Sequence, residues 1–278
     1  MMNIAIVTDS TADIPADLIE KHQIHVVPNL VIIDGQALVD GKDISRDEFY
    51  LRLPGMKEPP TTSTASSGEY QQLYQNLLEL GADQVISVHV SSQFSGIYNA
   101  AHTASQEFPG RVYVQDSQSV SMGLGFQVLA AAESIARHAT IGEILALLAD
   151  IRPRVRLIAM LDTLEYVRRS GRVSWARARL GGLLQIKPFI EVREGGKVIS
   201  LGEARTRSKG IARLKELILG LGELERLAIL HTRAEADARQ ILSELRNRLP
   251  FDPLVINVTT VIGTHVGPNG LGFAAVVK

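Results

Sequence analysis

The sequence of 278 residues contains no cysteine. The protein therefore has no disulfide, no thiolate metal site and no cysteine nucleophile. A chain of this kind fits the cytoplasm, where we expect it to be. No apolar run approaches the ~20 residues that a membrane-spanning helix needs. The opening residues, Met-Met-Asn-Ile-Ala-Ile-Val, have no basic segment before an apolar one, so we expect no signal peptide.

Aromatic residues are scarce, at 5% of the chain with a single tryptophan, and the formal net charge is only −1. The charges are uneven, because residues 168–213 carry 12 Lys and Arg against three Asp and Glu. This stretch indicates a local anionic partner, although a solvated basic surface would give the same pattern. Trp175 and Phe189 are its only aromatic residues, and no nucleic-acid-binding motif occurs in it. We therefore expect no nucleic acid partner.

Strands and helices alternate through the first half of the chain. Three strand-like segments each end in a polar loop: the strands are 4–8, 85–90 and 111–115, and the loops are 9–11, 91–96 and 116–119. This order predicts an α/β fold in which helices cover both faces of a mostly parallel sheet, giving three α/β/α layers. The polar loops would then gather at the carboxyl ends of the strands, where ligands bind to such sheets.

Pro153 marks a boundary in this pattern, because strands and helices follow a mixed order beyond it. We predict an N-terminal α/β domain over 1–153 and a smaller α+β domain over 154–278. The pattern also predicts a helix over 174–184. The sequence therefore describes a protein of two domains.

The C-terminal segment holds a further candidate group. A strand is predicted over 254–262, and residues 263–270, Gly-Thr-His-Val-Gly-Pro-Asn-Gly, follow it. Three glycines and a proline permit a tight turn and close approach of the backbone to a ligand. We expect His265 to be held in the middle of this loop.

Residues 91–96, Ser-Ser-Gln-Phe-Ser-Gly, form the strongest local candidate site. They lie between the strand 85–90 and a helix predicted over 97–108. Hydroxyls and backbone N–H groups at such a turn suit an anion, which could be a carboxylate, a phosphate or an oxyanion. An ordinary loop capped by serine would have the same sequence. A second dense set of hydroxyls follows at 61–64, Thr-Thr-Ser-Thr.

Asp9 and Asp116 follow two of the strands and raise the question of a metal. Carboxylates suit Mg²⁺, but we favour a role in capping and bracing the loops. The histidines have no metal-ligand spacing, and His89, on an apolar strand, is interpreted as a core or loop-bracing residue. We therefore predict no metal site.

Several motifs together resemble the DegV family, and more specifically its fatty-acid-binding members. Each motif is weak alone, but their order along almost the whole chain is specific. The motifs are Val7–Thr11, Pro60–Ser63, Ser91–Gly96, Asp116-Ser117, Met122–Gly125, Asp162–Tyr166, Ser170–Arg172, Lys187-Pro188, Arg205–Arg207 and Gly263–Pro268.

The resemblance implies a two-domain protein with a long-chain fatty acid, such as palmitate, stearate or oleate, buried in a tunnel. The resemblance further implies that the chain is, as such proteins are in many bacteria, the binding subunit of a fatty acid kinase and is not catalytic alone. It presents the carboxylate to a separate ATP-dependent kinase subunit, which makes an acyl phosphate for phospholipid synthesis. No cofactor is implied, and transient contact with a membrane is compatible with this role.

The family pattern also assigns residues. It implies that Thr62, Ser95 and His265 hold the carboxylate. The supporting loop residues are Thr61, Ser63, Phe94, Gly96 and Gly267. The basic residues that would dock the kinase are Arg169, Arg172, Arg205 and Arg207, for which internal ion pairs are the rival interpretation.

This chain departs from the family pattern near the carboxylate site. Gln93 and Phe94 stand where glycine and an aliphatic residue are more usual, and Thr64-Ala65-Ser66 replaces Gln-Pro-Ser or Gln-Pro-Ala. Neither change removes a carboxylate ligand. Phe94 would alter the shape of the tunnel near the head group, and with it the preferred chain length.

Two other classes of function remain open from the residues. Ser95, His265 and an acid such as Asp9 or Asp116 could form a hydrolase triad, although the chain lacks the Gly-x-Ser-x-Gly elbow. The second class is a carrier of another small lipid or of a small carbonyl compound. A carbonyl carrier, related to the dihydroxyacetone kinases, would need a histidine placed to form a covalent hemiaminal, and His265 is the candidate. The identity of the ligand discriminates among these alternatives.

Overall fold

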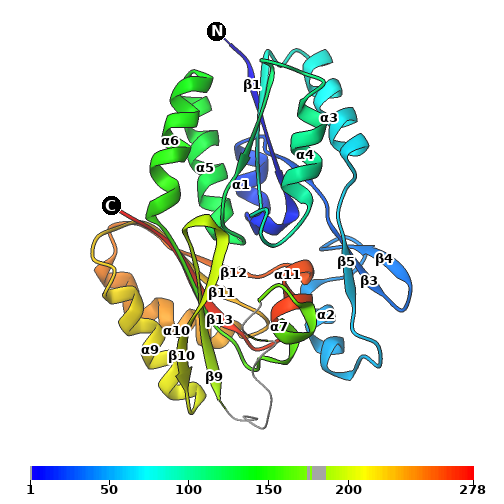
Figure 1. Ribbon diagram of the computed structural model, residues 1–278. Coiled ribbons are helices and arrows are strands. Elements are labelled where there is room, and N and C mark those ends of the chain that lie inside the picture. Colours follow the sequence, from blue (N-terminus) through cyan, green and yellow to red (C-terminus); the bar gives the residue numbers. More distant parts are fainter. Residues whose placement is uncertain (1, 174–175, 177–185) are drawn as a thin grey trace. The chain divides into compact units, whose positions relative to one another are not determined.

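The computed structural model describes residues 2–173, 176 and 186–278, and these form two compact units (Figure 1). Unit 1 consists of Met1–Asn29, Ser63–Arg154 and Glu194–Gly196. Unit 2 consists of Leu30–Thr62, Val155–Arg193 and Lys197–Lys278. The helix predicted over 174–184 lies outside the described residues, apart from Ala176.

Unit 1 is built on a parallel four-stranded sheet, as the sequence predicts. Its strand order is β2-β1-β6-β7. The strands are β1 (Ile4–Asp9), β2 (His25–Val27), β6 (Gln84–His89) and β7 (Val112–Asp116). Every residue of β6 is buried, because this strand lies inside the sheet and both of its faces are covered. The polar loops after β1, β6 and β7 therefore follow the same ends of neighbouring strands.

Helices cover both faces of this sheet. Figure 1 shows α3 and α4 on one side of β1, and α5 and α6 on the other. The helices are α1 (Ala16–Lys21), α3 (Ser67–Glu79), α4 (Ile97–Ser105), α5 (Met122–Ala136) and α6 (Ile141–Arg154), with the short 3-10 turn η1 (Ser10–Ala12) after β1. Ser66 and Glu69 form a capping box at the start of α3. The three-layer α/β/α arrangement is confirmed.

Unit 2 contains a mainly antiparallel six-stranded sheet with the order β10-β9-β8-β13-β11-β12. Its strands are β8 (Val155–Met160), β9 (Lys187–Arg193), β10 (Lys197–Ala204), β11 (Leu224–His231), β12 (Leu254–Asn257) and β13 (Leu271–Val277). The helices α9 (Arg207–Leu219) and α10 (Glu235–Leu245) pack on it through a buried core that includes Phe189, Leu214, Ile229, Ile241 and Phe273.

A second part of unit 2 positions the candidate site. It has a small sheet with the order β4-β3-β5 and three short helices. These elements are β3 (Leu30–Ile33), β4 (Gln36–Val39), β5 (Thr61–Ser63), α2 (Arg46–Arg52), α7 (Glu165–Ser170) and α11 (Thr260–Val266). The described residues also form three 3-10 turns: η2 (Leu53–Gly55) and η4 (Arg246–Arg248) in unit 2, and η3 (Glu194–Gly196) in unit 1.

The division into units differs from the single boundary expected between residues 153 and 154. Residues 30–62 belong to unit 2, which is therefore not the smaller part. The reason is a buried cluster formed by Val31, Ile33, Ile44, Phe49, Tyr50 and Leu53, against which Tyr166 packs. Such contacts between distant segments leave no mark in the local sequence pattern.

The structure also changes the expected conformation around His265. The strand β12 ends at Asn257, and the predicted tight loop begins as the helix α11. Thr259 caps this helix, because its hydroxyl oxygen accepts a hydrogen bond from the N–H of Ile262 at 3.5 Å.

No helix among the described residues combines the length and apolarity needed to cross a bilayer.

Candidate functional site

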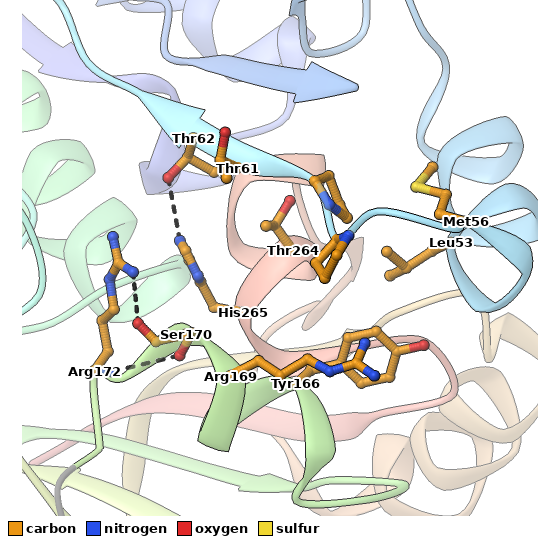
Figure 2. A pocket seen from close by; sticks show the side chains of 12 residues that line it. Leu53, Met56, Thr61, Thr62, Tyr166, Arg169, Ser170, Arg172, Thr264 and His265 are labelled. Atoms are coloured by element: carbon orange, nitrogen blue, oxygen red, sulfur yellow. Dashed lines mark hydrogen bonds between the residues drawn. The ribbon is translucent and has the colours of Figure 1, made fainter. Parts of the chain in front are cut away.

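Two of the three predicted carboxylate residues meet within unit 2. Thr62 lies on β5 and His265 on α11, and Thr62 Oγ1 is 3.3 Å from His265 Nε2. Figure 2 shows the two side chains facing each other across this contact. A separation of 203 positions in the sequence is thus closed by the tertiary structure.

A set of specific contacts anchors the helix that carries His265. The N–H of Thr260 donates to Asp40 Oδ1 at 2.7 Å, which places a carboxylate at the start of α11. Asp40 is itself paired with Arg46 at 3.1 Å. The hydroxyl of Thr264 donates to the carbonyl of Thr260 at 2.9 Å. His265 therefore sits on a helix whose first turn is held by Asp40.

The pair lies at the wall of a pocket of about 520 Å³, within the usual size range of small-molecule sites. The lining residues are Leu53, Met56, Pro59, Pro60, Thr61, Thr62, Tyr166, Arg169, Ser170, Arg172, Thr264 and His265. Figure 2 shows Thr62, His265, Ser170 and Arg172 toward one side, with Leu53 and Met56 toward the other. The pocket therefore combines a polar wall with an apolar one.

His265 is neutral at physiological pH. Burial and, to a smaller extent, the positive charge of Arg172 together lower the pKa of its imidazole to about 4. A neutral imidazole has one N–H donor and one acceptor nitrogen. Nδ1 is buried and has no hydrogen-bond partner among the described residues. One hydrogen-bonding position of the His265 imidazole is thus left unused by the described residues.

Two arginines also line the pocket, and they differ in their partners. Arg169 is paired with Glu165, one turn earlier on α7. Arg172 is exposed and donates from Nη1 to the carbonyl of Ser170 at 2.6 Å, but it forms no ion pair with the described residues. Arg172 is consequently a cation at the rim of the pocket that no acidic side chain in the described part of the chain neutralises.

The third predicted carboxylate residue, Ser95, belongs to unit 1. It precedes α4, and its hydroxyl oxygen accepts a hydrogen bond from the N–H of Ile97 at 3.3 Å. The loop around it turns tightly, since the N–H of Phe94 donates to the carbonyl of Ser91 at 2.9 Å. The supporting residues Ser63 and Gly96 also fall in unit 1, and the role of Ser95 stays a prediction.

The two aspartates of the polar loops brace the backbone, as we favoured. Asp9 accepts hydrogen bonds from the N–H groups of Thr11 and Val90, at 3.0 and 3.2 Å. Asp116 accepts from the hydroxyl of Ser92 at 2.7 Å and from the N–H of Gln118, also at 2.7 Å. No group of three or more potential metal ligands gathers among the described residues.

Asp9, one of the two acids considered for a hydrolase triad with Ser95 and His265, is engaged by a different histidine. The imidazole that contacts Asp9 is that of His89, with Nδ1 at 3.0 Å from Asp9 Oδ2. His89 Nε2 lies 2.7 Å from the hydroxyl of Ser87. Although these three residues have the connectivity of a triad, all are fully buried, so no substrate can reach the serine. His89 is a core residue, which confirms the interpretation of the sequence.

The remaining arginines predicted to dock a partner also differ from each other. Arg207 is held internally, since its Nε donates to Asp237 at 2.7 Å and its Nη1 donates to the carbonyl of Asn269 at 2.7 Å. Arg205 is exposed and forms no hydrogen bond or ion pair with the described residues. The rival interpretation of internal ion pairing therefore describes Arg207.

Sequence reasoning did not assign most of the pocket wall. Leu53, Met56, Tyr166, Ser170 and Thr264 line it together with the predicted residues. Tyr166 and Ser170 lie in the motifs 162–166 and 170–172, which was the available signal. Leu53 and Met56 had none, because they reach the site only through the packing of η2 and the following loop.

Comparison with known proteins identifies relatives along the whole chain. A family model described as "Uncharacterised protein, DegV family" matches residues 3–278. A DegV domain-containing protein of Streptomyces coelicolor is 37% identical over 274 residues, covering 97% of each chain. The protein named DegV of Bacillus subtilis is 36% identical over 279 residues, covering 98% of each chain.

Solved structures give the same result for the fold. A DegV family protein from Thermus thermophilus, described by its fatty acid binding, has a TM-score of 0.91 at 33% identity, with both chains covered completely. DegV of Bacillus subtilis, described as a fatty acid binding protein, has a TM-score of 0.87 at 34% identity, again over both whole chains. The chain belongs to the DegV family, as its motifs predicted.

Proposed function

We propose that this protein binds a long-chain fatty acid in the cytoplasm and presents its carboxylate to a separate ATP-dependent kinase subunit. The kinase would form an acyl phosphate for phospholipid synthesis, and this chain would not be catalytic alone. The observation that carries the proposal is the Thr62–His265 pair at the wall of a pocket that is partly polar and partly apolar. The two solved relatives that are described as fatty acid binding support it.

The chemistry of the pair suits a carboxylate. A buried carboxylate is costly unless hydrogen-bond donors compensate it, and the Thr62 hydroxyl and the His265 N–H become such donors when a ligand replaces the 3.3 Å bond between them. We propose Ser95 as a third. Each of these donors offers a single hydrogen bond, whereas a bidentate guanidinium holds both carboxylate oxygens at once. One carboxylate oxygen would thus stay available to attack the γ-phosphate of ATP, forming the new O–P bond while ADP leaves.

The hydrocarbon tail would supply most of the affinity. At ~0.8 kcal/mol for each buried CH₂ group, about 15 methylenes contribute on the order of 12 kcal/mol before ordering costs. The route of the tail through a tunnel belongs to the proposal. A lipid bound this tightly should remain with the protein through purification.

Docking of the kinase is proposed through the exposed arginines that have no acidic partner. Arg172 and Arg205 meet this description among the described residues. Arg169 and Arg207 have acidic partners within unit 2 and are weaker candidates. Unpaired guanidinium groups suit both an acidic protein surface and the phosphates of a nucleotide.

Native mass spectrometry of the purified protein, followed by extraction and identification of the lipid, tests the proposed ligand. We expect a mass excess of one fatty acid. A protein that is empty and also refuses added fatty acids would contradict the proposal. Small carbonyl compounds and esters would then be the next ligands to try, since they represent the two alternative classes of function.

Reversing the charge of Arg205 tests the proposed kinase docking. In Arg205→Glu we expect acyl phosphate formation by an added kinase subunit to slow roughly tenfold or more, because a rim charge steers association. Fatty acid binding should be unchanged. The matched control is Arg248→Glu, which reverses an exposed arginine on η4. Equal loss of binding and phosphorylation in Arg205→Glu would refute a docking role.

A further inference from the structure

The helix that carries His265 has glycines at two points where it touches an aromatic ring. Gly263 lies within α11, and Gly267 is its C-cap. They are joined by the last hydrogen bond of the helix, from the N–H of Gly267 to the carbonyl of Gly263 at 2.8 Å. His265 lies midway between them in the sequence, so any shift of these two contacts moves its backbone.

The first contact is with Tyr50 of α2. A Cβ at Gly263 would lie 2.6 and 2.7 Å from the ring atoms Cε1 and Cζ of Tyr50 and would also collide with its hydroxyl. Tyr50 is fully buried. Its hydroxyl donates to the carbonyls of Val258 and Thr259, at 2.9 and 3.2 Å, where the chain enters α11. Tyr50 therefore fixes both the start of the helix and its closest approach to α2.

The second contact is with Tyr166 of α7. Gly267 has φ 81° and ψ 176°, a conformation essentially restricted to glycine. A Cβ at this position would lie 2.7 Å from Cε2 and 2.8 Å from Cγ of Tyr166, and it would collide with Cδ2. Tyr166 also lines the pocket together with His265, as Figure 2 shows. Its ring thus touches both the end of α11 and the ligand space.

We propose that Tyr50 and Tyr166 are positioning residues for the carboxylate site, acting through Gly263 and Gly267 to set the place of the His265 imidazole. Because glycine has no Cβ, the α11 backbone can lie in direct contact with both rings. The two rings then act as fixed supports of this backbone. The expected effect on fatty acid affinity rests on the proposed function, whereas the expected effect on the position of the His265 imidazole does not.

The test follows the ionisation of His265 and the affinity for a fatty acid in the same variants. In the unchanged protein the imidazole should stay neutral down to about pH 5, because burial and Arg172 lower its pKa to about 4. In Tyr166→Ala, water gains access beside Gly267, and we expect the pKa of His265 to move toward its ordinary value of 6.5. We also expect about a tenfold loss of affinity, the effect of one misplaced hydrogen bond.

Nuclear magnetic resonance of protein labelled with ¹⁵N-histidine reports the imidazole, and His265→Gln assigns its signal. Tyr166→Phe keeps the ring and should behave like the unchanged protein in both measurements. Tyr98→Ala, which removes a half-buried tyrosine of unit 1, is the matched control. Gly263→Ala acts from the other support, since its methyl group displaces α11 from Tyr50, and it should also lower the affinity.

Three outcomes would overturn the proposal. The first is a His265 titration in folded Tyr166→Ala that equals that of the unchanged protein. The second is a Tyr166→Phe protein whose His265 titration differs from that of the unchanged protein. The third is a Gly263→Ala protein that matches the unchanged protein in both measurements. If Tyr166→Ala does not fold, Gly263→Ala and Tyr166→Leu decide the question. If the unchanged protein binds no fatty acid, the proposed function fails, and the titration of His265 still tests the positioning role.

Discussion

The double variant Thr62→Val/His265→Ala is expected to lose its bound fatty acid. Hydrogen bonds to a charged group contribute about 1.5–3 kcal/mol each, so each single substitution should weaken binding roughly 10- to 150-fold. Valine keeps the shape of threonine without its hydroxyl, and the two side chains lie within 3.3 Å of each other. The double variant leaves the buried carboxylate without either donor. The contacts of the tail are unchanged in this variant, so they do not compensate the free energy lost at the carboxylate.

Native mass spectrometry measures the occupancy, and titration with a fluorescent fatty acid measures the affinity. Thr64→Val and His102→Ala are matched controls, because both residues are exposed and neither lines the pocket. The side chains are neighbours and share one hydrogen bond, so their effects are not expected to add exactly. Full occupancy in the double variant would place the carboxylate elsewhere and would remove the central observation behind the proposed function.

Replacing Asp9 by alanine is expected to lower the free energy of unfolding by about 3–5 kcal/mol, the range found when one partner of a buried charged pair is removed. Asp9 and His89 are fully buried, with Asp9 Oδ2 at 3.0 Å from His89 Nδ1. The network continues from His89 through Ser87 to the hydroxyl of Tyr74, which donates to Ser87 Oγ at 2.8 Å. Removing the carboxylate leaves several buried donors without an acceptor.

Chemical denaturation measures this effect, and Asp17→Ala is the control, because Asp17 is an exposed carboxylate on α1. Surface substitutions of that kind usually change stability by less than about 0.5 kcal/mol. A loss below about 1 kcal/mol in Asp9→Ala would show that the buried network contributes little to the stability of unit 1.

The contribution of Asp9 to the free energy of unfolding depends on pH. Burial alone would raise the pKa of the Asp9 carboxyl, but the hydrogen bond and charge of His89, with the hydrogen bonds from Thr11 and Val90, lower the pKa overall. The folded pKa is thus below the unfolded value of about 3.9. The contribution to stability is therefore complete above that value and is lost as the pH falls through the folded pKa. Asp9→Asn should lack this part of the acid sensitivity.

Much of the fold could be predicted from local sequence. The apolar run 85–90 becomes the fully buried strand β6, and Ser66 and Glu69 form the capping box that starts α3. These features depend on hydrophobic periodicity and on hydrogen bonds between near neighbours, and both are visible in a short window of residues. Thr62 and His265 were assigned from the resemblance to the DegV family, and the structure brings them into contact.

What the sequence by itself determined was the order of strands and helices, the parallel sheet of unit 1 and the membership of the family. Only the tertiary structure decided that residues 30–62 join unit 2, that His265 stands on a helix, and that Arg207 is paired with Asp237. The physical reason is the range of the interactions. Helix caps and strand alternation are settled between neighbours, whereas the contacts of Tyr50 and Tyr166 with the glycines of α11 join two side chains and a backbone from three distant segments, whose packing no local pattern encodes.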